Sequence, residues 1–291
     1  MKSSLRMGVA TALLLLSNCA KDLSCYRDMI IGVWVEQTFD GQPVETNLQN
    51  VHIFDRSNSR TIRYIADFDG DSRNIVEASF VYFVDCKIIT TIGPYSANNV
   101  IVTIDREEEV KRFNDTILRV KVVEDRGSNN TFLPDVQEIV YKKTNSKNLN
   151  AKAIQNLWEM THSSDPTVPP FQIRFNSDET YAIFFEKESE GEEDEEEGRW
   201  EEKVDERGRY TVYDFFLTIT FVNNPIFGLP EKNDVACWEI EITEVEGEKD
   251  KEKDTAKEMT MRWSAVRNIN GQLVEKSFLF TSVAPPIEEV E

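Results

Sequence analysis

The chain has 291 residues and a formal net charge of −20, because 53 acidic side chains outnumber 33 basic ones. A surface this acidic repels phosphates, so the composition excludes nucleic acid as a partner and disfavours docking on anionic lipid headgroups. Hydrophobic residues make up 40% of the chain and aromatic residues 10%, which is enough apolar side chain to build folded cores and excludes wholesale disorder.

The first 18 residues have the pattern of a secretory signal peptide. Lys2 and Arg6 form a basic start, and an apolar run of 10 residues follows from Met7 to Leu16. This run is too short to span a bilayer, which takes about 20 apolar residues. We therefore expect residues 1–18 to be removed and the mature protein to lie outside the cytoplasm.

The segment Leu16-Ser17-Asn18-Cys19 resembles the lipobox of bacterial lipoproteins, in the looser form of the Bacteroidetes type. The resemblance implies that Cys19 becomes the lipidated first residue and that residues 19–28 form a tether. It implies a cell-envelope location on either face of the outer membrane, with the lipid anchor as the only contact with the membrane. An ordinary secreted protein cut near Ala20 remains the alternative.

Three further cysteines follow the lipobox: Cys25, Cys86 and Cys237. An odd number allows at most one bridge within the chain, in a compartment where disulfides persist. The candidate bridge is Cys25–Cys86, which would close a loop of about 60 residues and contribute on the order of 4 kcal/mol in the chain-entropy model. Three isolated buried thiols are the alternative.

Short segments rich in β-branched and aromatic residues, separated by Asn, Asp, Gly and Ser turns, predict antiparallel strands throughout the chain. In the first half they are 30–37, 50–54, 60–68, 75–85, 87–93, 99–105, 116–125 and 136–143. In the second half they are 154–162, 171–175, 180–185, 198–204, 209–214, 215–222, 235–245, 258–267 and 274–283. No long helical pattern intervenes, which disfavours a parallel α/β sheet.

The two halves repeat one another. Trp34 in the first strand matches Trp158, 158 − 34 = 124 residues later, and each Trp is followed by a strand that ends in Phe, at Phe54 and Phe175. Self-similarity at a domain-sized period indicates tandem duplication. The polar segment 143–152 is predicted to be the linker. We therefore expect one domain at 29–145 and a second at 151–284.

A leading strand with Gly32 two places before Trp34, about 120 residues of antiparallel strands and a closing aromatic and basic strand resemble the lipocalin-like (calycin-type) domains of Bacteroidetes-type lipoproteins. The resemblance implies an all-β fold of two tandem up-and-down β-barrels with about eight strands each. Trp34 and Trp158 would plug the closed end of each barrel, or form part of a ligand wall. The second copy departs from the motif, with Asn156 in the place of the glycine.

The charge is concentrated in the second half. Residues 1–150 carry 18 basic and 20 acidic side chains, a net charge of −2, whereas residues 151–291 carry 15 and 33, a net charge of −18. Two runs, 186–198 and 244–258, account for most of this difference and are predicted to be solvated hairpin tips. Weak cation binding by 186–198 remains an alternative, although calcium needs six to eight oxygens in a fixed geometry.

No G-x-S-x-G, H-E-x-x-H or P-loop motif occurs, and we expect no cofactor, no metal site and no enzymatic activity. The two histidines, His52 and His162, are interpreted as core or rim positions of strands. The leading hypothesis is a non-enzymatic binding module that holds a small neutral or cationic ligand in a barrel. The alternative is a structural or protein-interaction subunit of a surface complex, with an envelope protein as partner and solidly packed barrels.

Overall fold

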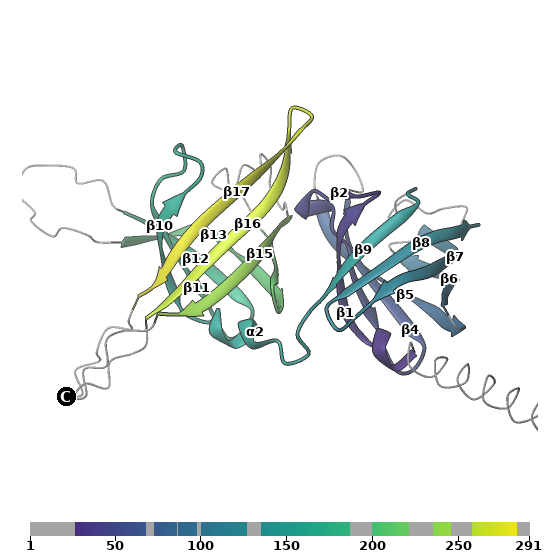
Figure 1. Cartoon of the computed structure of the whole chain (residues 1–291). Helices are drawn as coiled ribbons and strands as arrows, with labels where there is room; N and C mark the ends of the chain where they lie inside the picture. Colours follow the sequence, from purple (N-terminus) through teal and green to yellow (C-terminus); the bar gives the residue numbers. More distant parts are fainter. Residues whose placement is uncertain are drawn as a thin grey trace, which may run out of the picture. The chain divides into compact units, whose positions relative to one another are not determined.

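The computed structural model describes residues 27–67, 73–85, 87–97, 100–126, 135–186, 200–220, 235–245 and 258–283. The chain divides into two compact units whose main boundary lies between Lys143 and Thr144. The strands of each unit close into an eight-stranded antiparallel β-barrel (Figure 1). The prediction of an all-β chain with two tandem barrels is therefore confirmed.

The first barrel is a simple meander in which strands that follow one another in sequence pair with one another. Its first strand, β1, also pairs with its last strand, β9, and this pairing closes the barrel. A short strand, β2 (Gln42–Pro43), adds to β1, and a 3-10 turn, η1 (Thr46–Leu48), precedes β3 in sequence. The eight barrel strands are β1 (Gly32–Phe39), β3 (Val51–Phe54), β4 (Ser59–Asp67), β5 (Arg73–Asp85), β6 (Ile88–Ala97), β7 (Val100–Phe113), β8 (Ile117–Asp125) and β9 (Glu138–Lys143).

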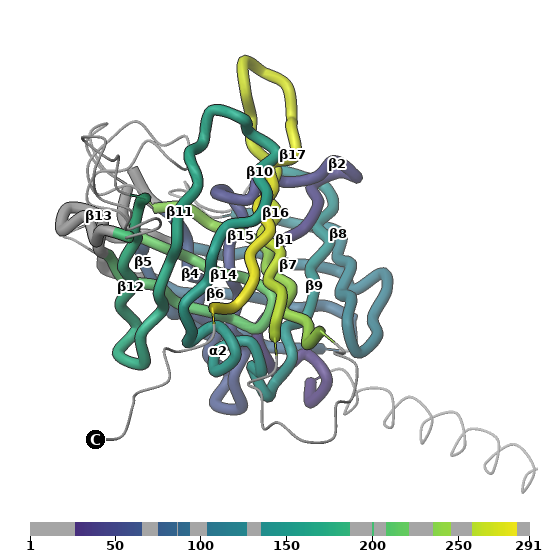
Figure 2. Tube along the Cα trace, turned by 90° about the vertical axis from the view of Figure 1, so that its left-hand side faces the viewer, coloured from purple at the N-terminus to yellow at the C-terminus, as the bar shows by residue number. Residues whose placement is uncertain are grey.

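The second barrel has the same order of strands and closes by pairing its first strand, β10, with its last, β17. Figure 2 shows β10, β17 and β16 side by side, as this pairing requires. The strands are β10 (Leu157–Ser163), β11 (Phe171–Phe175), β12 (Thr180–Glu186), β13 (Trp200–Tyr213), β14 (Phe216–Thr220), β15 (Val235–Glu244), β16 (Met259–Ile269) and β17 (Gln272–Ser282).

The segment 143–152, predicted as a linker without regular structure, contains the start of a short helix, α2 (Leu149–Ala153). Side chains rather than apolar periodicity hold this helix in place. Asn148 donates to the carbonyl of Val212 at 2.8 Å, and Asn150 donates to the carbonyl of Asp214 at 2.9 Å. Such amide bonds carry no periodic signal, which explains why the sequence pattern missed the helix.

Two strand predictions need correction. The segments 198–204 and 209–214 were predicted as separate strands, but they form one strand, β13, with an irregular register opposite Ala182 and Phe184. Gly208, which resembles a turn residue in the sequence, lies inside this strand. A Cβ there would overlap the carbonyl oxygen of Thr220, so the position has room for glycine alone.

The second correction concerns β7. The strand predicted at 99–105 continues to Phe113, through an acidic stretch that resembles a loop in the sequence. Glu108, in the middle of this stretch, is fully buried. A charged residue is therefore part of the interior of the first barrel, and the sequence alone gave no partner for it.

Candidate functional site

The first barrel buries a group of seven polar and charged side chains, six of which are joined by hydrogen bonds, while the seventh acts on the others through its charge. We refer to this group as the interior polar cluster. Its members come from six different strands, and each is at most 1% exposed to solvent. They are Glu36, His52, Arg60, Thr91, Arg106, Glu108 and Tyr141.

The alternation of strand residues explains how these side chains reach the interior. Residues two apart on a strand face the same side of a sheet, so Glu36 follows Trp34 on the inner face of β1. The register places His52 directly opposite Trp34 and Tyr141 directly opposite Glu36. Because β1 pairs with β3 on one side and with β9 on the other, closure of the sheet brings His52 and Tyr141 to the same region of the interior.

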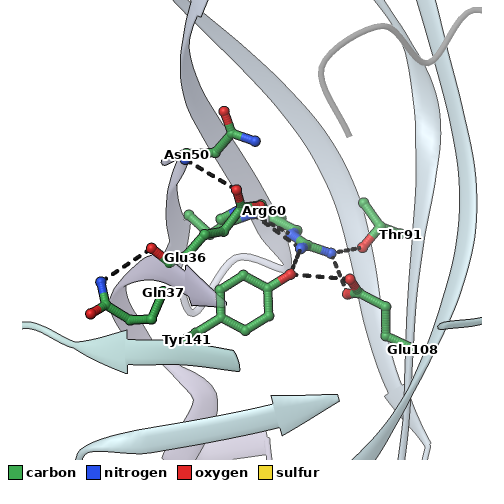
Figure 3. A network of polar contacts seen from close by, with 8 residues as sticks. Glu36, Gln37, Asn50, Arg60, Thr91, Glu108 and Tyr141 are labelled. Carbon is green, nitrogen blue, oxygen red and sulfur yellow. Dashed lines mark hydrogen bonds and ion pairs between the residues drawn. The ribbon is translucent and has the colours of Figure 1, made fainter. Parts of the chain in front are cut away.

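Arg60 lies at the centre of the interior polar cluster (Figure 3). Its Nη1 donates to Glu108 Oε2 at 2.7 Å and to Thr91 Oγ1 at 2.8 Å, and its Nη2 lies 3.4 Å from the Tyr141 hydroxyl. The Tyr141 hydroxyl in turn donates to the second carboxylate oxygen of Glu108 at 3.2 Å. One guanidinium thus joins β4, β6, β7 and β9 through directional bonds.

The same guanidinium fixes the tautomer of His52. Its Nε and Nη2 approach His52 Nδ1 at 3.2 and 3.0 Å, and since arginine only donates hydrogen bonds, Nδ1 must accept. A neutral ring then carries its proton on Nε2, which faces Glu36 Oε1 at 2.7 Å. The other oxygen of Glu36 accepts from the backbone N–H of Asn50 at 3.1 Å.

Burial and neighbouring charges set the protonation of the cluster. Burial raises the pKa of Glu36 to about 8, against the opposing effects of the Asn50 bond and of Arg60. Burial and the positive Arg60 hold the pKa of His52 well below its usual value. At neutral pH His52 is therefore uncharged and Glu36 is protonated. A second proton cannot bind to the His52 ring, because Nδ1 already accepts hydrogen bonds from Arg60.

Glu108 behaves in the opposite way to Glu36. Its burial alone would raise the pKa, but Arg60 and Arg106 outweigh this effect and hold the pKa of Glu108 below its usual value. Arg106 also lies 3.2 Å from Asp125 at the edge of the barrel. The cluster together with Asp125 therefore contains two opposite-charge pairs and one proton-binding carboxyl, and its net charge falls by one when Glu36 ionises.

Such a cluster is not what stability alone would select. Desolvating two charges costs several kcal/mol per ion, and packed apolar residues in place of a buried ion pair are often as stable or more stable. The second barrel supplies this comparison within the same chain. Its closure follows the same register, since Trp158 and Met160 lie opposite Ser282 and Phe280 as Trp34 and Glu36 lie opposite Lys143 and Tyr141.

Counting along the paired strands, every member of the interior polar cluster has an apolar or aromatic counterpart in the second barrel. In the same order as the cluster, the counterparts are Met160, Ile173, Tyr181, Ile219, Ala236, Trp238 and Phe280. These residues belong to, or pack against, one apolar core. Aromatic rings fill that core, with centroids 5.0 Å apart for Trp263 and Phe280 and 5.1 Å apart for Trp238 and Phe278.

The structure places both predicted tryptophans in equivalent, fully buried positions. The indole N–H of Trp34 donates to the carbonyl of Ile30 at 2.7 Å, and that of Trp158 donates to the carbonyl of Ile154 at 2.8 Å. The same bond to the residue four places earlier thus occurs in each copy. These contacts are those of a buried core residue on the first strand of each barrel.

The departure of the second copy at Asn156 has a local explanation. Gly32 adopts a φ of +136°, and a Cβ there would lie 2.8 Å from Cε of Lys143. The second copy has Ser282 in place of Lys143 opposite the tryptophan, and Asn156 does not adopt a positive φ. The shorter neighbour and the ordinary backbone therefore accommodate a side chain.

Other residues singled out in the sequence lie outside the site or outside the described ranges. Cys19, Cys25 and Cys86 lie outside the described ranges, so lipidation stays a prediction and the Cys25–Cys86 bridge stays a candidate. Only Glu186 of the acidic run 186–198 is described, so the solvated hairpin tip stays a prediction and cation binding its alternative. Cys237 is a buried thiol whose Sγ lies 3.7 Å from the hydroxyl of Thr218. His162 is exposed on β10, whereas His52 is in the core.

Within the described ranges, no group of three His, Cys, Asp or Glu side chains could hold a metal ion. No helix in those ranges is long and apolar enough to cross a membrane. Comparison of the chain with models of protein families, with curated proteins and with solved structures found no match.

Proposed function

We propose that the protein is a lipid-anchored cell-envelope protein with lipocalin-like barrels, whose first barrel holds a small polar ligand without catalysing a reaction. The observation that carries the proposal is the difference between the two interiors. Two barrels with matching register differ at seven interior positions, and the first retains charges that the second shows to be dispensable for closing the fold.

The electrostatics of the cluster support a neutral or cationic ligand. With a proton on Glu36, the charges of the pairs Arg60–Glu108 and Arg106–Asp125 balance, and without that proton the group carries one net negative charge. An eight-stranded barrel is just wide enough to be filled by side chains or to enclose one small ligand. The buried polar groups already bond to one another, which favours a binding role over catalysis by an exposed acid or base.

Native mass spectrometry of the full chain from its own cells tests the ligand. We expect a co-purifying small molecule whose occupancy falls in Thr91→Val, because this nearly isosteric change removes a hydroxyl partner of Arg60. Thr218→Val is the matched control, since Thr218 is a buried threonine of the second barrel. Absence of any bound molecule, or equal loss in both variants, would contradict a ligand in the first barrel.

The lipid anchor has a separate test. We expect Cys19→Ala to lack the acyl mass and to move from the membrane fraction to the soluble fraction, with Cys237→Ala as the control. A variant that stays with the membrane would show that another feature holds the protein there. This result would leave the ligand proposal unaffected.

A second candidate function, a protein-interaction subunit of a surface complex, is favoured by one observation on the outer face of the first barrel. Val81 and Ile92 are direct cross-strand partners on β5 and β6 and are 49% and 43% exposed, and Phe83 is 53% exposed. Exposed apolar neighbours of this kind mark interaction surfaces. Cross-linking in intact cells with a photoreactive residue at Phe83 would yield a specific adduct if this function is correct.

A further inference from the structure

The outer face of the second barrel has a groove of about 470 Å³, within the range of pockets that hold small molecules. It lies over β11, β12 and β13 and belongs to a single unit of the chain, whereas the interior polar cluster belongs to the other unit. We refer to it as the outer-face groove. Its lining residues are Arg174, Asn176, Thr180, Tyr181, Ala182, Phe184, Gly208 and Arg209.

A small residue forms part of the base of the outer-face groove. Ala182 pairs with Arg174 across β11 and β12, and its neighbours in sequence, Tyr181 and Ile183, belong to the core of the second barrel. Because successive strand residues face opposite sides of a sheet, Ala182 faces outward, and its methyl group leaves space above the sheet.

Two arginines flank this hollow. Arg174 is on β11 and Arg209 on β13, so their backbones are two strands and two residues apart, roughly 12 Å, which two long side chains can bridge from either side. The guanidinium of Arg174 lies over the Phe184 ring, 5.2 Å from its centroid. A guanidinium over a ring keeps hydrogen-bond donors for planar, bidentate bonds.

Asp178, in the turn between β11 and β12, already has hydrogen-bond partners. Its Oδ1 accepts from the backbone N–H of Thr180 at 3.1 Å and from the Thr180 hydroxyl at 2.6 Å. These bonds, more than Arg209, lower the pKa of Asp178. In the described ranges, neither Arg174 nor Arg209 forms an ion pair, so both present positive charge to the groove.

We propose that the outer-face groove binds a small organic carboxylate, with the carboxylate between Arg174 and Arg209 and the apolar body of the ligand against Phe184 and Ala182. Arginine matches a carboxylate in two parallel hydrogen bonds, and the aromatic wall offers the contact that an inorganic anion cannot use. This site is independent of the ligand proposed for the first barrel.

Isothermal titration of the mature chain tests the proposal with three probes: phenylacetate, 2-phenylethanol and inorganic phosphate. We expect saturable binding of phenylacetate, with at least tenfold weaker binding of the neutral alcohol and of phosphate. Equal affinity for the alcohol would remove the role of the arginines, and equal affinity for phosphate would remove that of the apolar wall. Either result would overturn the proposal, as would binding that does not saturate.

Variants locate the site. We expect Arg174→Gln and Arg209→Gln each to weaken phenylacetate binding at least tenfold, and Ala182→Leu to abolish it by filling the hollow while both arginines remain. Arg262→Gln, an exposed arginine on β16 of the same barrel, is the matched control and should leave the affinity unchanged. Equal weakening by Arg262→Gln would show a general charge effect and overturn the proposal. Thermal denaturation confirms that each variant is folded.

Discussion

Glu36 and Met160 occupy equivalent positions in the two barrels: Glu36 lies opposite Tyr141 across β1 and β9, and Met160 lies opposite Phe280 across β10 and β17. A carboxyl that titrates in one barrel thus corresponds to a thioether in the other. The closure of the sheet does not depend on which of the two is present. The properties of the interior polar cluster can therefore be tested without assuming that they are needed for the fold.

The stability of the first barrel should fall as the pH rises from about 6.5 to 8. Burial raises the pKa of Glu36 in the folded state to about 8. Between the pKa of the unfolded state and pH 8, Glu36 is protonated in the folded barrel and ionised in the unfolded chain, so folding takes up a proton. The free energy of unfolding therefore falls as the pH rises, until Glu36 ionises in the folded barrel as well. Below pH 6.5 the lowered pKa of His52 acts in the opposite sense and offsets this slope, because only the unfolded His52 is protonated there. Over the roughly 1.5 pH units between about pH 6.5 and 8, at about 1.36 kcal/mol per unit, the free energy of unfolding should fall by about 2 kcal/mol.

Hydrogen exchange of peptides from β1 and β3 as a function of pH measures this loss for the first barrel separately. Glu36→Gln should flatten the dependence between pH 6.5 and 8, since it cannot ionise. The second barrel, with Met160 at this position, serves as the internal control. A slope that persists in Glu36→Gln would show that another group is responsible.

Arg60→Met should destabilise the first barrel by about 3–5 kcal/mol, because it leaves Glu108 buried without its principal counter-charge. The matched control is Arg119→Met, whose ion pair with Glu138 at 2.7 Å is exposed to solvent, so its loss should change the stability far less than Arg60→Met does. Denaturant unfolding followed by hydrogen exchange gives both values. Equal effects of the two changes would mean that burial of the Arg60 pair has no energetic consequence.

The double variant Arg60→Met, Glu108→Leu should be more stable than the sum of the two single changes predicts. Removing both partners leaves no unpaired buried charge, whereas each single change leaves one. We expect a coupling free energy of at least about 2 kcal/mol from a double-mutant cycle. Additive effects would indicate that Arg60 and Glu108 do not interact in the folded barrel.

Gly32→Ala should destabilise the first barrel by about 1–3 kcal/mol, because alanine rarely adopts a φ of +136°. Adding Lys143→Ser, which copies the second barrel, should recover only the part due to the 2.8 Å contact with the lysine. Asn156→Ala is the control in the second barrel and should cost less than about 1 kcal/mol. Thermal unfolding followed by barrel-specific hydrogen exchange distinguishes these cases.

The alternation of apolar residues was sufficient to predict the strands, the duplication and the buried tryptophans, because each of these features is local or repeats at a fixed spacing. Trp34 and Trp158 could be matched from the sequence for this reason. The short helix α2 and the length of β7 were missed, since amide bonds define the first and an acidic stretch conceals the second.

The interior polar cluster could not be predicted. Arg60 and Glu108 are 48 residues apart, and Glu36 and His52 are 16 apart, so their contacts depend on register and closure rather than on local pattern. A partial signal was present at Glu36, which is two residues after Trp34 and therefore on the same face of its strand. His52 was interpreted as a core or rim position, and it lies in the core.

The pairing of the first strand with the last has a consequence for how the chain acquires its structure. Trp34 meets its neighbour Lys143 only after all the intervening strands have been made, and Trp158 likewise waits for Ser282. A chain growing from its N-terminus therefore leaves an open sheet edge until residue 143 has emerged, and then again until residue 282. Premature termination within either half would leave that edge exposed and ready to associate with other chains.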